Sequence, residues 1–372
     1  LDGPALSAIV EEVKTSLGRV DVLIHAAGML IDRTLPNKEP EQFDLVFDVK
    51  ADGFFSLIRA AKDNNLTGLL PLYGAAWLFG DHPYGTAVDG DETSLANIRH
   101  RDLLGFYEDF VGADRLIVSV VGDIDAPAVI GALTEAFADW RPAAQPLPEI
   151  TAAEPQAGRR VLLVDKPGAT QTYFWIGNVG VPVGAPGRAE LDVANTVFGG
   201  RFTSMLMTAL RVEGGLTYSA RSAVERYAET GTVTIRSFTE TSTTIDAIDL
   251  AISTLDRLHI KGLNNALITS ARNYIMGQFP PTLETASSLA RMLAFLEQNG
   301  LDRRYVDEYG AALREATPVT ISNTIAEVYP TADDLVFVLI GDAATIRDDV
   351  AKYGPVTELS ITAPRFRPQP PK

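Results

Sequence analysis

The chain has 372 residues, 46% hydrophobic and 22% charged, which is typical of a soluble globular protein with two or three domains. Its net charge of −16 would repel nucleic acid and anionic membranes, so neither is expected as a partner. The absence of cysteine excludes disulfides, thiolate nucleophiles and cysteine-bound zinc. The most apolar run, 69–80, is too short to span a bilayer and is expected to be a buried strand or helix. The chain starts at Leu1 without a leader-like segment, so we expect a soluble excerpt that lacks its natural start, from an unassigned compartment.

Residues 1–65 are expected to form part of a parallel α/β unit. The pattern predicts helices at 4–17 and 41–62, with a strand at 20–25 between them. A loop of small residues, Ala26, Ala27 and Gly28, follows that strand. The order strand, loop, helix favours a parallel sheet.

An internal repeat links two later parts of the chain. The segment 113–123, ADRLIVSVVGD, recurs 219 positions later as ADDLVFVLIGD at 332–342. Each copy is predicted to be a buried strand that ends in a Gly-Asp turn and leads into a helix, at 127–140 and 344–353 respectively. A repeat of this length indicates that the chain contains two related halves, with equivalent strands at 116–121 and 335–340.

The region after the first copy has a linker and then one long unit. Four prolines within 141–158 predict an exposed, semi-rigid connection. Hairpin-spaced strands followed by a run of helices favour an α+β fold, with helices packed on a mainly antiparallel sheet. The strands are predicted at 160–165, 170–177, 216–223, 231–238 and 334–340, and the helices at 188–198, 204–212, 243–258, 263–276, 283–297, 303–315 and 319–328; a further helix, 101–110, precedes the first repeat.

The segment 198–220, FGGRFTSMLMTALRVEGGLTYSA, is the strongest candidate site. Gly199 and Gly200 permit a tight turn and close approach of the backbone. Arg211 and Tyr218 flank a helix-to-strand turn, so both could donate to the oxygens of one polar ligand. On the residues alone a structural interpretation is favoured, in which Arg211 interacts with the helix dipole and Tyr218 is a half-buried strand residue.

A family resemblance reverses that preference. The segment is similar to the C-terminal half-domain of the insulinase/pitrilysin-type metallopeptidases, the inverzincins, through the pattern L-R-x-x-x-G-L-x-Y. Its residues here are Leu210, Arg211, Gly215, Leu216 and Tyr218. The resemblance extends over about 72–362, including the tail of the N-terminal half. It implies that Arg211, Tyr218, Gly199 and Gly200 bind peptide substrate near a zinc ion held by H-x-x-E-H in the other half.

The zinc-binding pattern of that family is absent from this sequence. Two imidazoles on one helical face are required, with a carboxylate base beside them. The four histidines are His25, His82, His100 and His259, and no two are four positions apart. We therefore expect no catalytic residues, no metal and no cofactor in this chain. Zinc is expected only in a catalytic partner or in a missing segment.

The first 65 residues resemble a different family, the ketoreductase domains of the short-chain dehydrogenase superfamily. GRVDVLIHAAGML resembles that family's fourth strand and loop, and Lys50 occupies the position of its active-site lysine. The phosphate-binding glycine turn and the catalytic Ser and Tyr segments are absent. Ala26, Ala27, Gly28 and Lys50 are therefore vestigial, and no functional NADP site is expected.

These features predict four parts: a truncated Rossmann-like fragment (1–65), the end of a peptidase-like N-terminal half (70–140), the linker (141–158) and a C-terminal half-domain (159–362). The predicted function is that of a non-catalytic, peptide-binding half of a zinc metallopeptidase. It would work with a homologous H-x-x-E-H-bearing subunit or half. A structural homologue that scaffolds an assembly is the alternative, and a ketoreductase remnant is a weaker one. A biological fusion and an assembly artefact both remain open as origins of the join.

Overall fold

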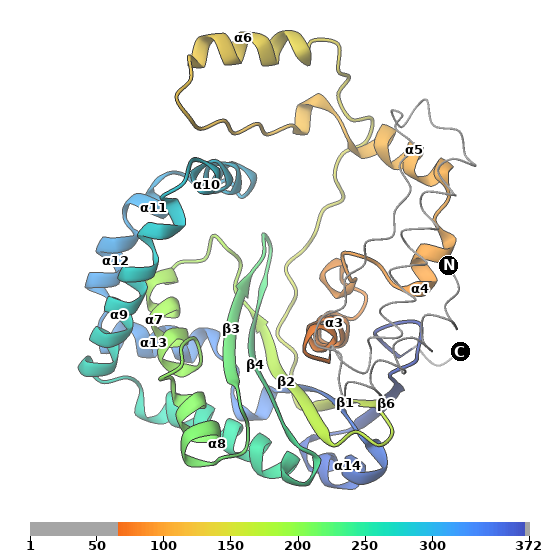
Figure 1. The fold of residues 1–372 in the computed structure, drawn as a ribbon, viewed down its shortest axis with the longest axis vertical. Helices are drawn as coiled ribbons and strands as arrows, with labels where there is room; N and C mark the ends of the chain where they lie inside the picture. Colours follow the sequence, from red (N-terminus) through yellow and green to blue (C-terminus); the bar gives the residue numbers. More distant parts are fainter. Residues whose placement is uncertain (1–65, 369–372) are drawn as a thin grey trace, which may run out of the picture. The chain divides into compact units, whose positions relative to one another are not determined.

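The computed structural model describes residues 66–368 (Figure 1). The predicted elements within 1–65, with the loop Ala26, Ala27, Gly28 and with Lys50, lie outside the described residues. The described chain divides into two units. The smaller comprises 66–115, 139–148 and 359–368, and the larger comprises 116–138 and 149–358.

A six-stranded sheet forms the centre of the larger unit, in the order β3-β4-β2-β5-β1-β6. The pairs β3–β4, β4–β2 and β2–β5 are antiparallel, whereas β5 and β1 are parallel. The strands are β1 (Arg160–Asp165), β2 (Gln171–Gly180), β3 (Ala220–Arg226), β4 (Gly231–Glu240), β5 (Val336–Gly341) and β6 (Val356–Ser360). All six residues of β5 are buried, as expected for a strand covered on both faces. The predicted α+β fold with a mainly antiparallel sheet is confirmed.

Helices cover this sheet and supply the rest of the core. Helix α7 packs against β3, and α8 packs against β4. The helices of the larger unit are α6 (Ala126–Ala136), α7 (Arg188–Phe198), α8 (Thr244–Lys261), α9 (Asn265–Gln278), α10 (Ala286–Gln298), α11 (Arg304–Asp307), α12 (Tyr309–Glu315), α13 (Pro318–Val328), α14 (Ala343–Val350) and a π-helix at Met207–Glu213. The smaller unit contains α3 (Leu66–Phe79), α4 (Glu92–Asn97) and α5 (His100–Phe110).

The two copies of the internal repeat differ in structure. The second copy forms the predicted buried strand, β5, followed by α14. The first copy leads into α6, but residues 116–121 form no strand, and the side chains of Leu116, Ile117 and Val118 are 40–46% exposed. A strand is stabilised by hydrogen bonds to a neighbouring strand. The described residues that precede this segment, 66–115, are helical or irregular and offer it no such neighbour. The prediction of an equivalent strand at 116–121 was wrong.

Other elements also differ from the sequence prediction. The strand predicted from 216 starts at Ala220, because residues 216–219 leave the sheet. The helix predicted at 303–315 is interrupted at Glu308 and becomes α11 and α12. The short edge strand β6 was not predicted.

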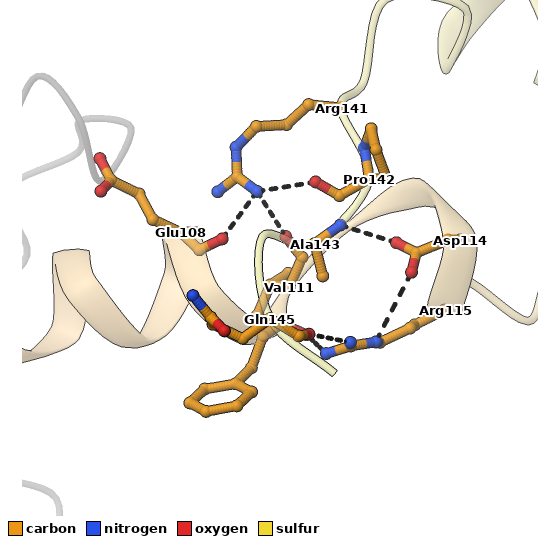
Figure 2. Close-up of polar contacts among 9 residues, drawn as sticks. Glu108, Val111, Asp114, Arg115, Arg141, Pro142, Ala143 and Gln145 are labelled. Carbon is orange, nitrogen blue, oxygen red and sulfur yellow. Dashed lines mark hydrogen bonds and ion pairs between the residues drawn. The ribbon is translucent and has the colours of Figure 1, made fainter. Parts of the chain in front are cut away.

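The proline-rich linker, 141–158, has no helix or strand, but both of its ends are held by hydrogen bonds. Arg141 donates to the carbonyl oxygens of Glu108 and Val111 at the end of α5, at 2.9 and 3.4 Å (Figure 2). At the other end, the amide of Gln156 donates to Asn178 Oδ1 at 2.9 Å. The residues between Gln145 and Gln156 are mostly exposed.

Candidate functional site

The candidate site starts at the π-helix Met207–Glu213, which carries Arg211. Leu210 is fully buried and fixes the inner face of the π-helix, while the neighbouring Arg211 is half-buried. The amide of Gly214 donates to the carbonyl of Ala209 at 2.8 Å, which is the i→i−5 spacing of a π-turn. Gly215 then has φ +61, a left-handed conformation that favours glycine and turns the chain toward Tyr218. Isolated π-turns occur frequently at functional sites.

Arg211 and Tyr218 lie together in the structure, and their binding of one ligand stays a prediction. The Arg211 guanidinium carbon is 4.3 Å from the centre of the Tyr218 ring. Phe202 approaches the same guanidinium, with its ring centre at 4.9 Å. The side chains of Phe202 and Tyr218 are 62% and 71% exposed, so this cluster is open to solvent. Cation–π attraction to two rings orders the long arginine side chain.

The polar atoms of the cluster are available to a ligand. Within residues 66–368, the Arg211 guanidinium donates no hydrogen bond and forms no ion pair, and the Tyr218 hydroxyl is likewise unpaired. A guanidinium has five donors in one plane, and aromatic rings that contact its faces leave those in-plane donors accessible. The arrangement can therefore donate hydrogen bonds to a carbonyl, carboxylate or developing oxyanion.

Phe202 was not identified as a site residue from the sequence. Its only signal was an aromatic residue two positions after the Gly199-Gly200 pair. Only the fold brings the ring to Arg211, nine positions further on, so spacing alone did not indicate the contact.

The glycine pair has a packing role in this structure. A Cβ on Gly199 would lie 2.2 Å from the backbone nitrogen of Ser222 on β3, closer than any real contact allows. A Cβ on Gly200 would lie 3.0 Å from Thr196 Cα on α7. Gly199 thus lets the end of α7 approach the strand that follows Tyr218. The assignment of both glycines to peptide binding stays a prediction.

The described histidines occupy separate places. His82 Nδ1 accepts a hydrogen bond from the Tyr84 amide at 3.1 Å, His100 starts α5, and His259 Nε2 lies 3.1 Å from the Pro330 carbonyl. Across residues 66–368, no group of three His, Asp or Glu residues is arranged to hold a metal ion. In the same residues, no helix combines the length and apolar character needed to cross a membrane.

The described chain is thus an α+β unit with a mainly antiparallel sheet, and it carries an exposed Arg–aromatic cluster at the π-helix. Residues 97–275 match the sequence profile of the peptidase M16 inactive domain. This match, with the relatives and solved structures described next, confirms the predicted resemblance to insulinase/pitrilysin-type peptidases.

Individual relatives agree with this family. An uncharacterized zinc protease of Mycobacterium bovis is 26% identical over 289 residues, which is 75% of this chain and 63% of that protein. A Bacillus subtilis protein with the same description is 25% identical over 56% of this chain and 50% of its own length. The matched region thus spans less than two thirds of these relatives.

Solved structures share the fold. The peptidase M16 inactive domain of Pseudomonas fluorescens has a TM-score of 0.69 at 20% identity, covering 81% of this chain and 73% of that chain. A protease from Helicobacter pylori has the same TM-score at 19% identity, covering 82% of this chain and 73% of its own.

The front of the chain matches a different family. Residues 2–68 match the profile described as enoyl-(acyl carrier protein) reductase. A peroxisomal hydratase-dehydrogenase-epimerase of Neurospora crassa is 29% identical over 131 residues, or 34% of this chain and 14% of that enzyme. These matches agree with the predicted reductase-like fragment.

Proposed function

We propose that this chain provides the non-catalytic, peptide-binding half of an insulinase/pitrilysin-type zinc peptidase. The observation that carries the proposal is the Arg211 guanidinium, which lies close to two exposed aromatic rings and leaves its donors unpaired within the described chain. An arginine used only to stabilise the fold is normally paired with carboxylates or carbonyls, as Arg226 is with Asp192.

Peptide binding follows from the chemistry of these side chains. The Arg211 fork and the Tyr218 hydroxyl can both donate to a backbone carbonyl, and hydrogen bonds to charged groups are stronger than neutral ones. If the carbonyl is the scissile one, the same donors stabilise the oxyanion that forms on it. The described residues do not fit a zinc ion, so the metal and the attacking water belong to the partner.

The partner that fits is a homologous half that carries H-x-x-E-H, either as a separate subunit or as another segment of a longer chain. The apolar segment 116–138 supports this proposal, because its first part belongs to the repeat copy 113–123 that matches β5 in sequence, while its apolar side chains remain exposed. The exposed apolar residues are Leu116, Ile117, Val118, Val120, Ile124, Ile130 and Phe137. A homologous half offers the strand neighbours that β5 has in its own sheet.

The test is reconstitution with an H-x-x-E-H-bearing homologous subunit. Arg211→Ala and Tyr218→Phe should each lower kcat/KM for a quenched-fluorescence peptide by about 10- to 1,000-fold, since each removes one hydrogen bond to a charged or developing anionic group. The matched control is Arg221→Ala, which removes the same charge from an exposed position on β3.

The control should retain wild-type turnover, and circular dichroism should show that all variants are folded. Unchanged turnover in both site variants would contradict the peptide-binding function and favour a scaffold.

A further inference from the structure

The segment that carries Tyr218 is not held by the sheet. The β3–β4 ladder ends at the pair Ala220 and Ser237, and residues 216–219 continue beyond it without ladder hydrogen bonds. The Leu216 amide donates back to the Leu210 carbonyl of the π-helix at 2.8 Å. The remaining backbone groups beside Tyr218 must therefore be held by something other than a paired strand.

Two buried hydroxyls of β4 hold this segment instead. Thr239 Oγ1 donates to the Leu216 carbonyl at 2.7 Å, and Ser237 Oγ donates to the Ser219 carbonyl at 2.9 Å. Thr239 is 1% exposed and Ser237 is 5% exposed. Because they are two positions apart on one strand, both side chains point to the same face of the sheet. The two hydroxyls thus hydrogen-bond to the backbone before and after Tyr218.

Each hydroxyl is itself fixed by neighbours. Thr239 Oγ1 lies 2.6 Å from the hydroxyl of Thr243, at the start of α8. Ser237 Oγ lies 3.2 Å from the hydroxyl of Thr217, which also accepts from the Ser219 amide at 3.1 Å. The resulting chain of hydrogen bonds connects the exposed segment to a rigid strand and to a helix terminus.

We propose that Ser237 and Thr239 are positioning residues that set the place of Tyr218 beside Arg211. The Tyr218 ring is 71% exposed and has little packing of its own, so its location is determined by the backbone that carries it. Fixing the carbonyls of Leu216 and Ser219 keeps the phenol hydroxyl and the guanidinium in one arrangement before ligand arrives. This inference rests on the proposed peptide-binding function.

The variants separate positioning from general stability. Thr239→Val keeps the shape but removes the donor to Leu216. Ser237→Ala removes the β4 donor to the Ser219 carbonyl and leaves only the Thr217 hydroxyl, which donates to the same carbonyl at 3.1 Å from within the segment. Thr239→Ser retains a hydroxyl and serves as the rescue. The matched control is Thr254→Val in α8, which removes a fully buried hydroxyl that donates to the Leu250 carbonyl at the same 2.7 Å.

The experiment has two readouts on the full chain. The first is the ¹⁹F NMR signal of fluorotyrosine incorporated at position 218. The second is the dissociation constant for a fluorescein-labelled unstructured peptide, measured by anisotropy. In Thr239→Val and Ser237→Ala the ¹⁹F signal should narrow and shift toward that of a mobile tyrosine. The dissociation constant should rise by about 5- to 30-fold, because each variant loses the free energy of about one hydrogen bond. Thr239→Ser and Thr254→Val should match wild type in both readouts.

Wild-type ¹⁹F signals in folded Thr239→Val and Ser237→Ala would overturn the inference. If Thr239→Val does not fold, Ser237→Ala against Thr254→Val decides the question. A separate result would overturn the proposed function: unchanged peptide binding in Tyr218→Phe and Arg211→Ala. In that case the ¹⁹F signal still reports whether the two hydroxyls position Tyr218.

Discussion

At the scale of single residues, Asp192 organises a polar cluster inside the half-domain. It accepts a hydrogen bond from the Tyr309 hydroxyl at 2.7 Å and forms ion pairs with Arg226 and, at 3.7 Å, with Arg188. The Arg188 guanidinium lies between the rings of Tyr305 and Tyr309, at 3.8 and 4.0 Å from their centres. Burial, followed by the negative charge of Asp192, raises the pKa of Tyr309, so its hydroxyl stays protonated and able to donate.

Tyr329 is a natural comparison, since it also feels the charge of Asp192 but is fully buried. Burial is the main cause of its raised pKa, and its hydroxyl has no hydrogen-bond partner in the described chain. A buried hydroxyl without a hydrogen-bond partner destabilises the folded state, whereas a buried hydroxyl with a partner stabilises it.

Phenylalanine at these two positions should therefore have opposite effects on stability. Tyr329→Phe should leave the free energy of unfolding unchanged or raise it by up to about 1 kcal/mol, because it removes an unsatisfied group. Tyr309→Phe should lower it by about 1–2 kcal/mol, because it removes a donor to a carboxylate. Urea unfolding followed by circular dichroism measures both, and equal losses in the two variants would show that Tyr329 has a partner.

At the scale of elements, the end of α5 depends on one distant side chain. Arg141 donates to the carbonyls of Glu108 and Val111, and to that of Pro142 in the linker (Figure 2). It also donates to the carbonyl of Tyr107 at 3.0 Å. The last carbonyls of a helix have no partner inside the helix, so a cation that donates to them caps the C-terminus. Gly112 permits this close approach, since a Cβ there would lie 2.0 Å from the Ala143 amide nitrogen.

Arg141→Ala should loosen the start of the linker. The amides of Ala144 and Gln145 donate to the carbonyls of Glu108 and Asp109 at 3.2 and 2.9 Å, and they should exchange with solvent faster once the cap is lost. The free energy that protects these two amides from exchange should fall by about 1–3 kcal/mol, which is the usual contribution of hydrogen bonds from a charged donor.

Hydrogen exchange by mass spectrometry measures the effect. Arg101→Ala is the control, because that side chain is 87% exposed and lies 3.5 Å from Asp102. Identical exchange at 144–145 in Arg141→Ala and wild type would contradict the capping role.

Most elements could be predicted from local pattern, and the exceptions have physical causes. Helix α7 and strand β1 have the predicted bounds, because their hydrophobic periodicity is visible in the local sequence. The repeat predicted a strand at 116–121 that does not form, because a strand also needs neighbouring strands, which a local sequence pattern does not supply.

At the candidate site, the sequence predicted that Arg211 and Tyr218 could act on one ligand; the two side chains are in contact, and shared ligand binding stays a prediction. It did not predict Phe202, the π-turn or the hydroxyls of β4. Each of these depends on tertiary contacts between segments whose spacing follows no helical or strand period. At Arg211, the residue type alone favoured a structural role, and the family resemblance led to the prediction of substrate binding.

At the scale of the whole molecule, the linker is the expected site of first cleavage. Its ends are held at Arg141 and Gln156, and the stretch between Gln145 and Gln156 is mostly exposed and irregular. A glutamate-specific protease should cut after Glu149, whereas the bond after Glu154 precedes Pro155 and should resist. The product should be a resistant fragment that begins at Ile150.

Mass spectrometry of a digestion time course identifies that fragment, and Glu149→Gln should delay its formation. Earlier cleavage after Glu213, which is exposed next to Gly214, would instead show that the candidate site is less ordered than the linker.

The exposed segment 116–121 also has a consequence for how copies of the chain behave in concentrated solution. Its sequence, LIVSVV, has no charge and no proline, which is the composition of segments that nucleate cross-β aggregates. The segment is flanked by charged residues that oppose aggregation: Asp114, Arg115, Asp123 and Asp125. The net charge of −16 adds electrostatic repulsion between copies of the chain. Salt screens that repulsion, so light scattering should show self-association at high ionic strength that Val118→Lys suppresses. Equal scattering by wild type and Val118→Lys would show that another surface causes the self-association.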